Sequence, residues 1–323
     1  MGGNAFKEKG IESKRLSKDE YDIFSGSFIR KLRKLYPGFS FVVPLSYSSK
    51  ESFGDLDIIT THQGDFSEIP NIQHRKVNGP CVSILIDNFQ IDLVRVPEDE
   101  YTTSWYYYSY NDLGNLLGKI FHKFGLKYGH RGLTLPVREG DHYLEEIILS
   151  KDQDQIMRFI GLEAWWEDEK DFETLEEIYR YVESSPFFNP KIYQYSVLNS
   201  VNKIRDRTRS TYQGFISRWK GKLEGDWYEF KEDKEYYLPV IFHYFPGTEK
   251  KYLEIIKKLS DRKFFKAQLN GAIISEWTEL EGKELGEFIR SFYYTLSNGW
   301  SKDLNEEQIK ETIMKLFGEF KCK

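Results

Sequence analysis

The chain has 323 residues, of which 40% are hydrophobic and 16% aromatic, so it can bury the cores of two domains and is no disordered tail. Its formal net charge of −5 argues against a protein that coats nucleic acid indiscriminately, because phosphate binding needs positive charge. Cys81 and Cys322 alone offer neither a disulfide framework nor a thiolate zinc set. The sequence has neither a transmembrane-length apolar run nor the apolar core of a signal peptide, so we expect a cytoplasmic protein without a membrane partner.

The first predicted element is a helix that begins near Ser17. Ser17 and Glu20 have the spacing of a capping box, and apolar residues recur at helical spacing from Phe24 to Leu35. The dipeptide Pro37-Gly38 ends this pattern, because proline lacks the amide that a helix needs. We therefore expect the helix to end just before a strand.

Strand-like segments follow this helix. Residues 39–44 and 55–61 have the pattern of strands, and residues 82–86 and 89–96 have that of a hairpin around Asp87-Asn88. A further helix is predicted from Asn111. These elements predict an α+β fold, with a mixed sheet and flanking helices over residues 1–140. From about residue 143 nearly every segment has helical spacing, so residues 141–323 are predicted to form a mostly α-helical domain.

Three aspartates lie within the predicted strands. Side chains of a strand alternate between its two faces, so Asp55 and Asp57 project from the same face. Asp92 adds a third acid inside an otherwise apolar strand. Neighbouring carboxylates repel unless a cation lies between them, and hard divalent ions prefer such oxygen ligands. A metal site explains all three acids, but solvated strand ends or an ion pair with Arg95 would also account for them.

Three sequence motifs share a resemblance to family X DNA polymerases. Residues 46–57, Ser-Tyr-Ser-Ser-Lys-Glu-Ser-Phe-Gly-Asp-Leu-Asp, resemble that family's Gly-Ser-Tyr-Arg-Arg-Gly-Lys-Glu-x-x-Gly-Asp-hydrophobic-Asp, with one residue deleted. Residues 90–101, Gln-Ile-Asp-Leu-Val-Arg-Val-Pro-Glu-Asp-Glu-Tyr, are similar to its Arg-Ile-Asp-Ile-Arg-Leu-Ile-Pro-Lys-Asp-Gln-Tyr. Residues 107–115 fall where its Tyr-Phe-Thr-Gly-Ser-Asp-Ile-Phe-Asn lies. Three motifs in the right order are far more specific than any one of them.

This resemblance implies a nucleotidyltransferase of the DNA polymerase beta superfamily that uses two Mg²⁺ ions, with Mn²⁺ as an alternative ion. Asp55, Asp57 and Asp92 would be its catalytic and metal-binding carboxylates. The motif positions and their neighbours that would bind the nucleoside triphosphate are Ser46, Lys50, Gly54, Tyr107, Tyr108, Asp112 and Asn115. By the same resemblance the serine would touch the triphosphate, the two tyrosines would face the sugar, and the last two residues would lie beside the base. Aromatic packing accounts equally well for the tyrosines in a protein that has 22 of them.

The chain departs from the family pattern at the phosphate loop. Leu45 replaces the family's glycine, while Ser48 and Ser49 replace its two arginines, which removes positive charge. Either Lys50 or Arg95 supplies the missing cation, or nucleotide affinity is weak, or the substrate is unusual. A domain that binds without catalysing remains an alternative.

The predicted helical half suggests RNA as the acceptor. Residues 163–180 hold eight acidic and two basic residues, whereas residues 201–222 hold seven basic residues and one acidic residue. From this basic stretch we predict RNA contacts at Lys203, Arg205, Arg207, Arg209, Arg218 and Lys220. Solvated helix faces of opposite sign would give the same pattern.

The order of the domains also suggests RNA. Only residues 1–18 precede the first helix, so we expect no DNA-binding module ahead of the sheet, and the extra mass follows it as in tRNA nucleotidyltransferases and poly(A) polymerases. Residues 269–289 resemble a glycine-containing segment of bacterial CCA-adding enzymes, without its aspartate and proline. Glycines there suit a turn between helices and a helix that opens at Gly282, and a plain helix–turn–helix packing element would have the same pattern.

The expected function is therefore Mg²⁺-dependent addition of a nucleoside monophosphate, taken from a nucleoside triphosphate, to a 3′ hydroxyl of RNA such as a tRNA end. A compact DNA polymerase similar to family X is one alternative. Nucleotidylation of a protein or a small molecule is a second. A non-catalytic RNA-binding relative is a third.

Overall fold

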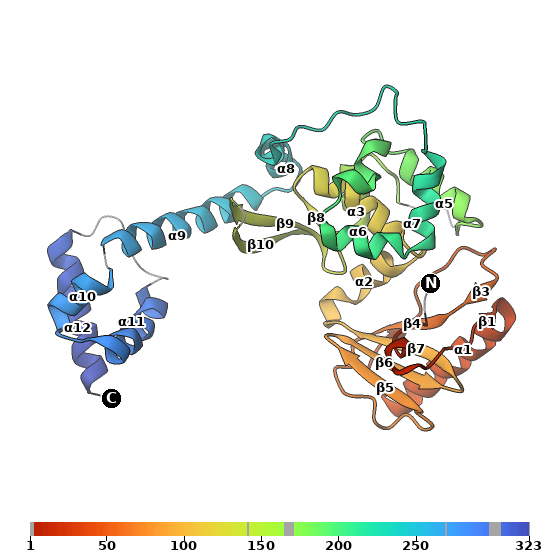
Figure 1. Ribbon diagram of the computed structural model, residues 1–323, viewed down its shortest axis with the longest axis horizontal. Coiled ribbons are helices and arrows are strands. Elements are labelled where there is room, and N and C mark those ends of the chain that lie inside the picture. The colour runs from red at the N-terminus through yellow and green to blue at the C-terminus, as the bar shows by residue number, and fades with distance from the viewer. Residues whose placement is uncertain (1–2, 141, 165–170, 269, 297–304, 323) are drawn as a thin grey trace. The chain divides into compact units, whose positions relative to one another are not determined.

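The computed structural model describes residues 3–140, 142–164, 171–268, 270–296 and 305–322 (Figure 1). The fold is α+β, as predicted, with a mixed five-stranded sheet followed by a helical C-terminal region. The chain divides into two compact units, residues 1–136 with 148–245 and residues 137–147 with 246–323. This division differs from the predicted boundary at residue 140, because residues 148–245, which are largely helical, belong to the same unit as the central sheet. Among the described residues, none of the helices combines the length and the apolar character needed to cross a membrane.

The strands and α-helices of the described residues have the following bounds. The strands are β1 (Leu16–Ser17), β2 (Phe41–Val42), β3 (Ser52–Phe53), β4 (Asp55–Thr60), β5 (His74–Asn78), β6 (Cys81–Ile86), β7 (Phe89–Arg95), β8 (Lys127–Gly129), β9 (Gly132–Glu139) and β10 (His142–Ser150). The helices are α1 (Lys18–Leu35), α2 (Tyr101–Tyr108), α3 (Leu113–Lys123), α4 (Gln153–Phe159), α5 (Leu175–Glu183), α6 (Ser200–Arg207), α7 (Ser210–Arg218), α8 (Leu238–Tyr244), α9 (Thr248–Gln268), α10 (Gly271–Thr278), α11 (Gly282–Leu296) and α12 (Glu306–Lys321).

The central sheet has the strand order β2-β4-β7-β6-β5. Strands β4 and β7 run parallel, and every other neighbouring pair is antiparallel. The hairpin between β6 and β7 turns at Asp87 and Asn88, whose φ angles are 50° and 60°. Two positive φ angles are typical of the type I′ turn that matches strand twist, so the predicted hairpin is confirmed.

Helix α1 covers one face of this sheet (Figure 1). Ser17 and Glu20 form the predicted capping box, in which the Ser17 side chain accepts from the Glu20 amide and the Glu20 side chain accepts from the Ser17 amide. From α1, Phe28 and Leu32 join a core that includes Leu56 of β4. The predicted first helix is confirmed, and its apolar stripe holds α1 against the sheet.

Helix α2 packs against β4 on the other face of the sheet. Ile59 of β4 and Val94 of β7 form a small core there, and Trp105 of α2 packs against it and donates from Nε1 to the Val43 carbonyl at 3.3 Å. The sequence analysis missed α2 because its segment, Tyr-Thr-Thr-Ser-Trp-Tyr-Tyr-Tyr, is rich in residues with modest helix propensity. Tertiary packing therefore determines this helix.

The sequence analysis also missed β5, β8, β9 and β10. Helical spacing was predicted from about residue 143, but residues 143–150 belong to strand β10. The prediction was wrong for these residues. β8, β9 and β10 form a three-stranded sheet, and Gly140 between β9 and β10 has a φ of 55°. Pairing between strands, which local periodicity does not report, determines these elements.

The helices after β10 bury aromatic side chains in two separate places. In the first unit, Tyr193, Tyr212 and Phe215 are almost completely buried, and the Tyr212 hydroxyl donates to the Tyr193 carbonyl at 2.8 Å. In the second unit, α10, α11 and α12 share a core that includes Phe288 and Ile313. Helix α11 begins at Gly282, as expected, whereas residue 269 at the start of the CCA-enzyme-like segment lies outside the described residues.

Candidate metal centre and adjoining cavity

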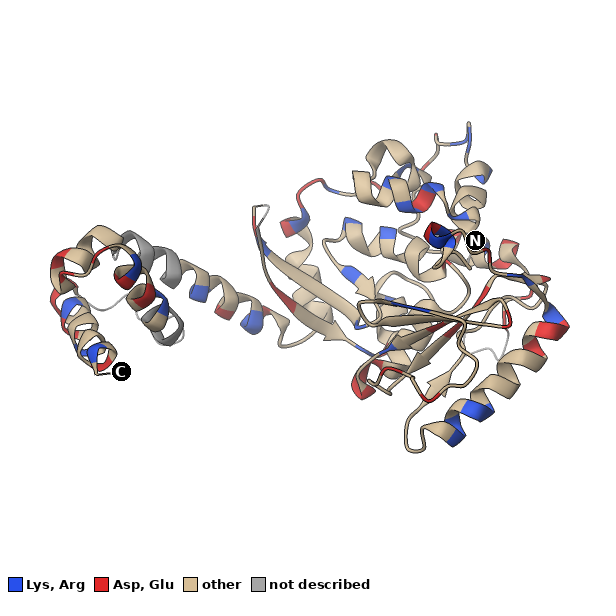
Figure 2. Cartoon of the chain, turned by 60° about the horizontal axis from the view of Figure 1, so that its bottom comes forward, with Lys and Arg blue, Asp and Glu red and all other residues tan. Residues whose placement is uncertain are grey.

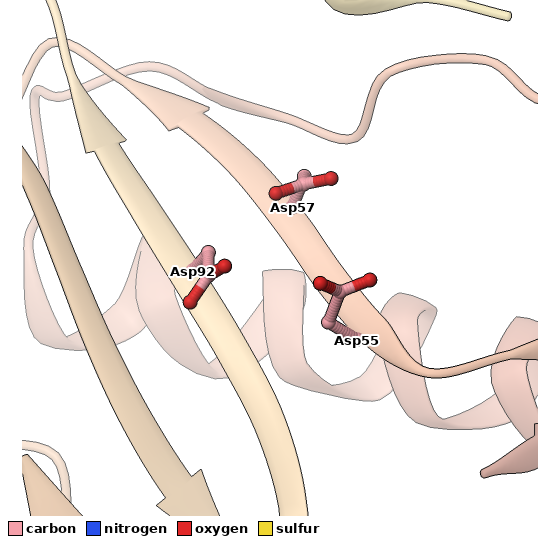
Figure 3. A group of neighbouring side chains, drawn as sticks. All are labelled: Asp55, Asp57 and Asp92. Atoms are coloured by element: carbon pink, nitrogen blue, oxygen red, sulfur yellow. The ribbon is translucent and has the colours of Figure 1, made fainter. Parts of the chain in front are cut away.

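Asp55 and Asp57 of β4 and Asp92 of β7 form a carboxylate triad (Figure 3). The parallel register pairs Asp57 directly with Asp92, and one oxygen from each of the three carboxylates lies within 4.8 Å of the other two. Leu56 and Ile58 are fully buried in the core on the opposite face, which confirms the predicted alternation along β4. Carboxylate oxygens at this spacing fit a divalent cation, whose bonds to such oxygens are about 2.0–2.6 Å long.

The Asp57 carboxylate is not neutralised by a neighbouring side chain. It makes no hydrogen bond or ion pair within the described part of the chain. Arg95, which might have paired with the acids, instead donates to the carbonyls of Gly79 at 2.8 Å and Pro80 at 3.1 Å. The alternative that Arg95 neutralises the acids is therefore wrong. A bound cation would balance a charge that the described residues leave without a direct partner.

Hydrogen bonds from two residues outside the predicted site hold the triad. The Gly3 amide donates to Asp55 Oδ2 at 3.0 Å. Gln90 Nε2 donates to both oxygens of Asp92, at 3.0 and 2.9 Å. Sequence reasoning could have found Gln90, because it stands two residues before Asp92 in a strand and so shares its face. Gly3 gave no such signal, since it is far from the triad in sequence.

Burial raises the pKa of two of the three acids. The pKa of Asp57 lies well above its ordinary value, chiefly through desolvation and then through the charges of Asp55 and Asp92, while Lys50 and Arg209 oppose the rise. Asp57 remains open to solvent, but the walls of a cavity surround it. Desolvation also raises the pKa of Asp92, against the effect of hydrogen bonds from Ser83 and Gln90. Both shifts show that the fold alone disfavours the ionised triad.

A cavity of about 400 Å³ opens over Asp55 and Asp57, within the size range of ligand pockets. Its lining comes from α1, the segment from β2 to β4, the segment from α2 to α3, and α6 with the start of α7. The lining residues are Tyr21, Pro44, Leu45, Ser46, Lys50, Phe53, Asp55, Asp57, Tyr107, Tyr108, Asn111, Asp112, Asn115, Arg205 and Arg209. A wider cavity of about 740 Å³ shares Lys50 and both aspartates with it and extends past Gly54 and Tyr179.

The structure brings together all the residues predicted to bind the nucleotide. Six of them line the cavity over the triad, and the seventh, Gly54, lines the wider cavity beside it. The six are Ser46, Lys50, Tyr107, Tyr108, Asp112 and Asn115. Residues from two motifs that are far apart in sequence, 46–57 and 107–115, therefore line adjoining cavities.

Lys50 provides one cation of the cavity. Its Nζ lies 4.5 Å from the centre of the Phe53 ring and donates to Asn111 Oδ1 at 3.2 Å. Phe53 in turn stacks on Tyr21 with ring centres 3.8 Å apart. Burial lowers the pKa of Lys50, while the charges of Asp55 and Asp57 oppose the change. The Lys50 ammonium therefore lies on the same cavity as Asp55 and Asp57.

Arg205 and Arg209 provide two further cations of the cavity. Both belong to the basic stretch that was predicted to contact RNA, and both lie beyond the predicted boundary at residue 140. Arg209, which precedes the first turn of α7, forms an ion pair with Asp112. The sequence analysis placed these arginines in another domain from the triad, and only the fold shows that they line the same cavity as Lys50.

A buried polar network lies behind Arg205. We call Asn115, Lys119, Arg205 and Asp206 the α3–α6 cluster. Asp206 is fully buried and accepts from Lys119 Nζ at 2.8 Å, from Arg205 Nε at 2.8 Å and from Asn115 Nδ2 at 3.3 Å. Arg205 also donates to Asn115 Oδ1 at 2.6 Å. Hydrogen bonds to Asp206, which is itself paired with Lys119, thus hold two cavity residues, Asn115 and Arg205, in place.

The two predicted sugar-facing tyrosines both line the cavity but differ in their packing. Tyr107 packs edge-on against Tyr128, with ring centres 5.5 Å apart. Tyr108 is partly exposed, and burial followed by the proximity of Tyr107 and Asp57 raises its pKa to about 12. Aromatic packing therefore accounts for part of Tyr107, while Tyr108 offers more of its ring to the cavity.

The remaining predicted RNA contacts lie outside the cavity over the triad. Arg218 is held by Glu183, from Nε at 3.0 Å, and by Glu176, and it lies over the Tyr179 ring. Arg207 lies over the Tyr195 ring at 5.6 Å. Lys220 is exposed and Lys203 is half-buried. Figure 2 shows acidic and basic residues interspersed along α1 and along the helices of the second unit.

Comparison with known proteins adds no relative to these observations. The chain matches no protein-family model and no curated protein. The case for a function therefore depends on the geometry of the site and on the motif order.

Proposed function

We propose that this protein is a Mg²⁺-dependent nucleotidyltransferase, and that it transfers a nucleoside monophosphate from a nucleoside triphosphate to a 3′ hydroxyl of RNA. One observation carries the proposal. Three carboxylates meet on adjacent parallel strands, and two of them, Asp55 and Asp57, line a cavity whose walls supply Lys50, Arg205 and Arg209. Acids that hold divalent ions beside cations and aromatic rings are the groups that phosphoryl transfer requires.

In this proposal Asp55 and Asp57 hold two Mg²⁺ ions, Asp92 helps to hold one of them, and Mn²⁺ is an alternative. Bound ions of this kind lower the pKa of the attacking hydroxyl, orient the triphosphate and offset charge on the leaving pyrophosphate. The hydroxyl gives up its proton to solvent and its oxygen forms a bond to the α-phosphorus, while the bond from that phosphorus to the oxygen it shares with the β-phosphate breaks. That oxygen leaves with the pyrophosphate. The protein contributes chiefly positioning and charge.

The cavity walls supply the nucleotide contacts of this proposal. Lys50 and Arg209 lie on the same cavity as Asp57 and match the negative charge of a triphosphate. Ser46 lines the same cavity, and its hydroxyl can donate to a phosphate oxygen. Tyr108 offers a partly exposed ring that a ribose or base can contact.

We propose a tRNA end as the acceptor. The support comes from sequence: the resemblance of residues 269–289 to CCA-adding enzymes, and the basic stretch that contains Lys203, Arg207 and Lys220. Exposed Arg207 and Lys220 remain available for RNA phosphates outside the cavity over the triad. Arg218 contributes less, because Glu176 and Glu183 already pair with it.

The test incubates the protein and Mg²⁺ with radiolabelled CTP or ATP and a tRNA that lacks its CCA end. We expect labelled tRNA from the wild type. The double variant Asp55→Asn with Asp57→Asn should lower the rate at least about 10³-fold, because it removes the charge that holds the cations. The matched control, Asp22→Asn with Asp87→Asn, removes the same charge from two exposed positions and should keep the wild-type rate.

Incorporation that survives the double change at the triad would overturn the proposed chemistry. The same incubation with gapped DNA and with cell lysate separates the acceptors. Label that enters only gapped DNA, or only protein, would overturn RNA as the acceptor and keep the nucleotidyltransferase.

A further inference from the structure

The segment at residues 3–5 contacts the triad through main-chain amides. The Gly3 amide donates to Asp55 Oδ2 at 3.0 Å. The Ala5 amide donates to Gln90 Oε1 at 2.8 Å, and the other end of the same Gln90 amide group donates to both oxygens of Asp92. Two of the three carboxylates are therefore held by this segment, one directly and the other through a single side chain.

Gly3 occupies a position where no other residue fits without a shift. Its φ is +84°, in the left-handed region that favours glycine. A Cβ at this position would lie 2.4 Å from the Gly54 carbonyl oxygen, which is backbone and immediately precedes Asp55. The close approach that excludes a side chain is also what brings the Gly3 amide within reach of the Asp55 carboxylate.

Several contacts after residue 5 anchor the segment. Phe6 is only 2% exposed, and Lys76 donates to the Ala5 carbonyl at 3.3 Å and to Glu8 at 3.1 Å. Ser13 Oγ then accepts from the Gln90 amide at 3.1 Å. The chain that follows the contact with the triad is thus attached to β5 and β7.

We propose that residues 3–5 are positioning residues of the metal centre, an inference that rests on the proposed function. The Gly3 amide donates to one oxygen of Asp55. This bond orients the carboxylate and leaves its other oxygen available for a cation. The Ala5 amide fixes the Gln90 side chain so that its two N–H bonds orient Asp92. Hydrogen bonds to metal-ligating carboxylates orient them, and their loss commonly weakens metal binding by about 10–100-fold.

The same contacts help to keep the acids together before a cation binds. Gln90 stabilises the charged form of Asp92 by donating to both of its oxygens. The segment therefore prepares two ligands of the site without contributing a ligand of its own. A segment that only covered the site would not need main-chain amides that donate toward the acids and Gln90.

The test is an Mn²⁺ titration followed by electron paramagnetic resonance, with full-length protein tagged at the C-terminal end and no nucleotide. We expect Gly3→Ala to weaken Mn²⁺ binding about 10–100-fold. A second variant, Gln90→Met, keeps the side-chain volume and should weaken binding to a similar extent. In transfer assays, both losses should diminish as the Mn²⁺ concentration is raised.

Gly38→Ala is the matched control. Gly38 has a φ of +87°, nearly that of Gly3, but a Cβ there would meet no atom within 4 Å. The control therefore carries the same left-handed strain without the steric contact, and it should bind Mn²⁺ as the wild type does. Thermal unfolding of each variant shows whether the fold is retained.

Equal Mn²⁺ affinity in the wild type, Gly3→Ala and Gln90→Met would overturn the inference and leave the proposed function intact. A faster transfer rate in Gly3→Ala would also overturn it, because the segment would then obstruct the site. An Asp55→Asn with Asp57→Asn variant that binds Mn²⁺ as tightly as the wild type would instead overturn the metal centre itself, and this inference with it.

Discussion

The carboxylate triad and the α3–α6 cluster differ in how their charge is balanced. In the carboxylate triad, three acids meet with no cation bonded to Asp57 among the described residues. In the α3–α6 cluster, a single fully buried acid, Asp206, accepts from Lys119, Arg205 and Asn115. The first group resembles a set of ligands, whereas the second is already complete.

The pKa shifts of the two groups have opposite signs. Burial raises the pKa of Asp57, and the neighbouring acids raise it further. Burial would also raise the pKa of Asp206, but hydrogen bonds from Arg205 and Lys119 lower it below the ordinary value. An acid that has its cations contributes to the folded state, and an acid that lacks them is retained for what it can bind.

The largest expected effect on stability comes from breaking the complete group. Asp206→Ala leaves the buried Lys119 ammonium and the Asn115 amide without their acceptor. Removal of one partner from a buried ion pair typically costs about 3–5 kcal/mol, so we expect a loss of that size in the free energy of unfolding. Urea denaturation followed by circular dichroism measures it.

A matched variant removes both charges of the pair. Lys119→Met with Asp206→Leu leaves no buried ammonium without a partner, and the more exposed Arg205 keeps its bond to Asn115, so this variant should lose less stability than Asp206→Ala alone. A double variant that is less stable than the single one would contradict this account of the α3–α6 cluster.

A smaller effect is expected where the α3–α6 side of the cavity meets the nucleotide. Arg209→Ala removes a half-exposed cation that lines the cavity with Asp57. A hydrogen bond to a charged group contributes about 1.5–3 kcal/mol, so the KM for the nucleoside triphosphate should rise roughly 10–100-fold. Steady-state kinetics at saturating tRNA measure this change.

Arg207→Ala tests whether nucleotide binding and acceptor binding depend on different arginines. Arg207 is exposed, lies over Tyr195 and does not line the cavity over the triad. Its loss should leave the KM for the nucleotide unchanged and raise the KM for tRNA. A rise in the nucleotide KM equal to that of Arg209→Ala would contradict the separate roles of these two arginines.

The triad could be predicted from the sequence because its geometry is local. Strand alternation places Asp55 and Asp57 on one face, and the apolar residues on both sides of Asp92 place it in a neighbouring strand. The first helix and the β6–β7 hairpin follow from equally local signals, a capping box and an Asp-Asn turn.

The cations of the cavity could not be predicted in the same way. Arg205 and Arg209 are held at the cavity by their contacts with Asn115 and Asp112, and periodicity reports nothing of such long-range contacts. The same limit explains the domain boundary at residue 140, because a change from strand-like to helical spacing is not a change of compact unit. Gly3 was missed for a related reason, since its contact with Asp55 crosses 52 positions of sequence.

The smallest expected effect is a difference in the pH dependence of stability between the two groups. Because the folded-state pKa of Asp57 is raised above the ordinary 3.8, its protonated form favours folding. That contribution is complete below pH 3.8 and is lost as the pH rises through the raised pKa. Asp206 has the opposite sign: its contribution is present above pH 3.8 and is lost as the pH falls through its lowered pKa.

We therefore expect Asp57→Asn to be more stable than the wild type in EDTA, with a Tm difference that grows as the pH rises above 3.8 and then levels off. The difference should be at most a few degrees, because Asp57 is open to solvent, which screens its charge, and about 1 kcal/mol shifts the Tm of a domain of this size by about 2–4 °C. Saturating Mg²⁺ should remove or reverse it, because the cation then stabilises the ionised wild-type triad and binds the variant less tightly. Thermal unfolding of both proteins across pH, with and without Mg²⁺, measures the effect. A Tm difference that ignores both pH and Mg²⁺ would mean that Asp57 is not part of a cation-binding group, and the contrast with Asp206 would disappear.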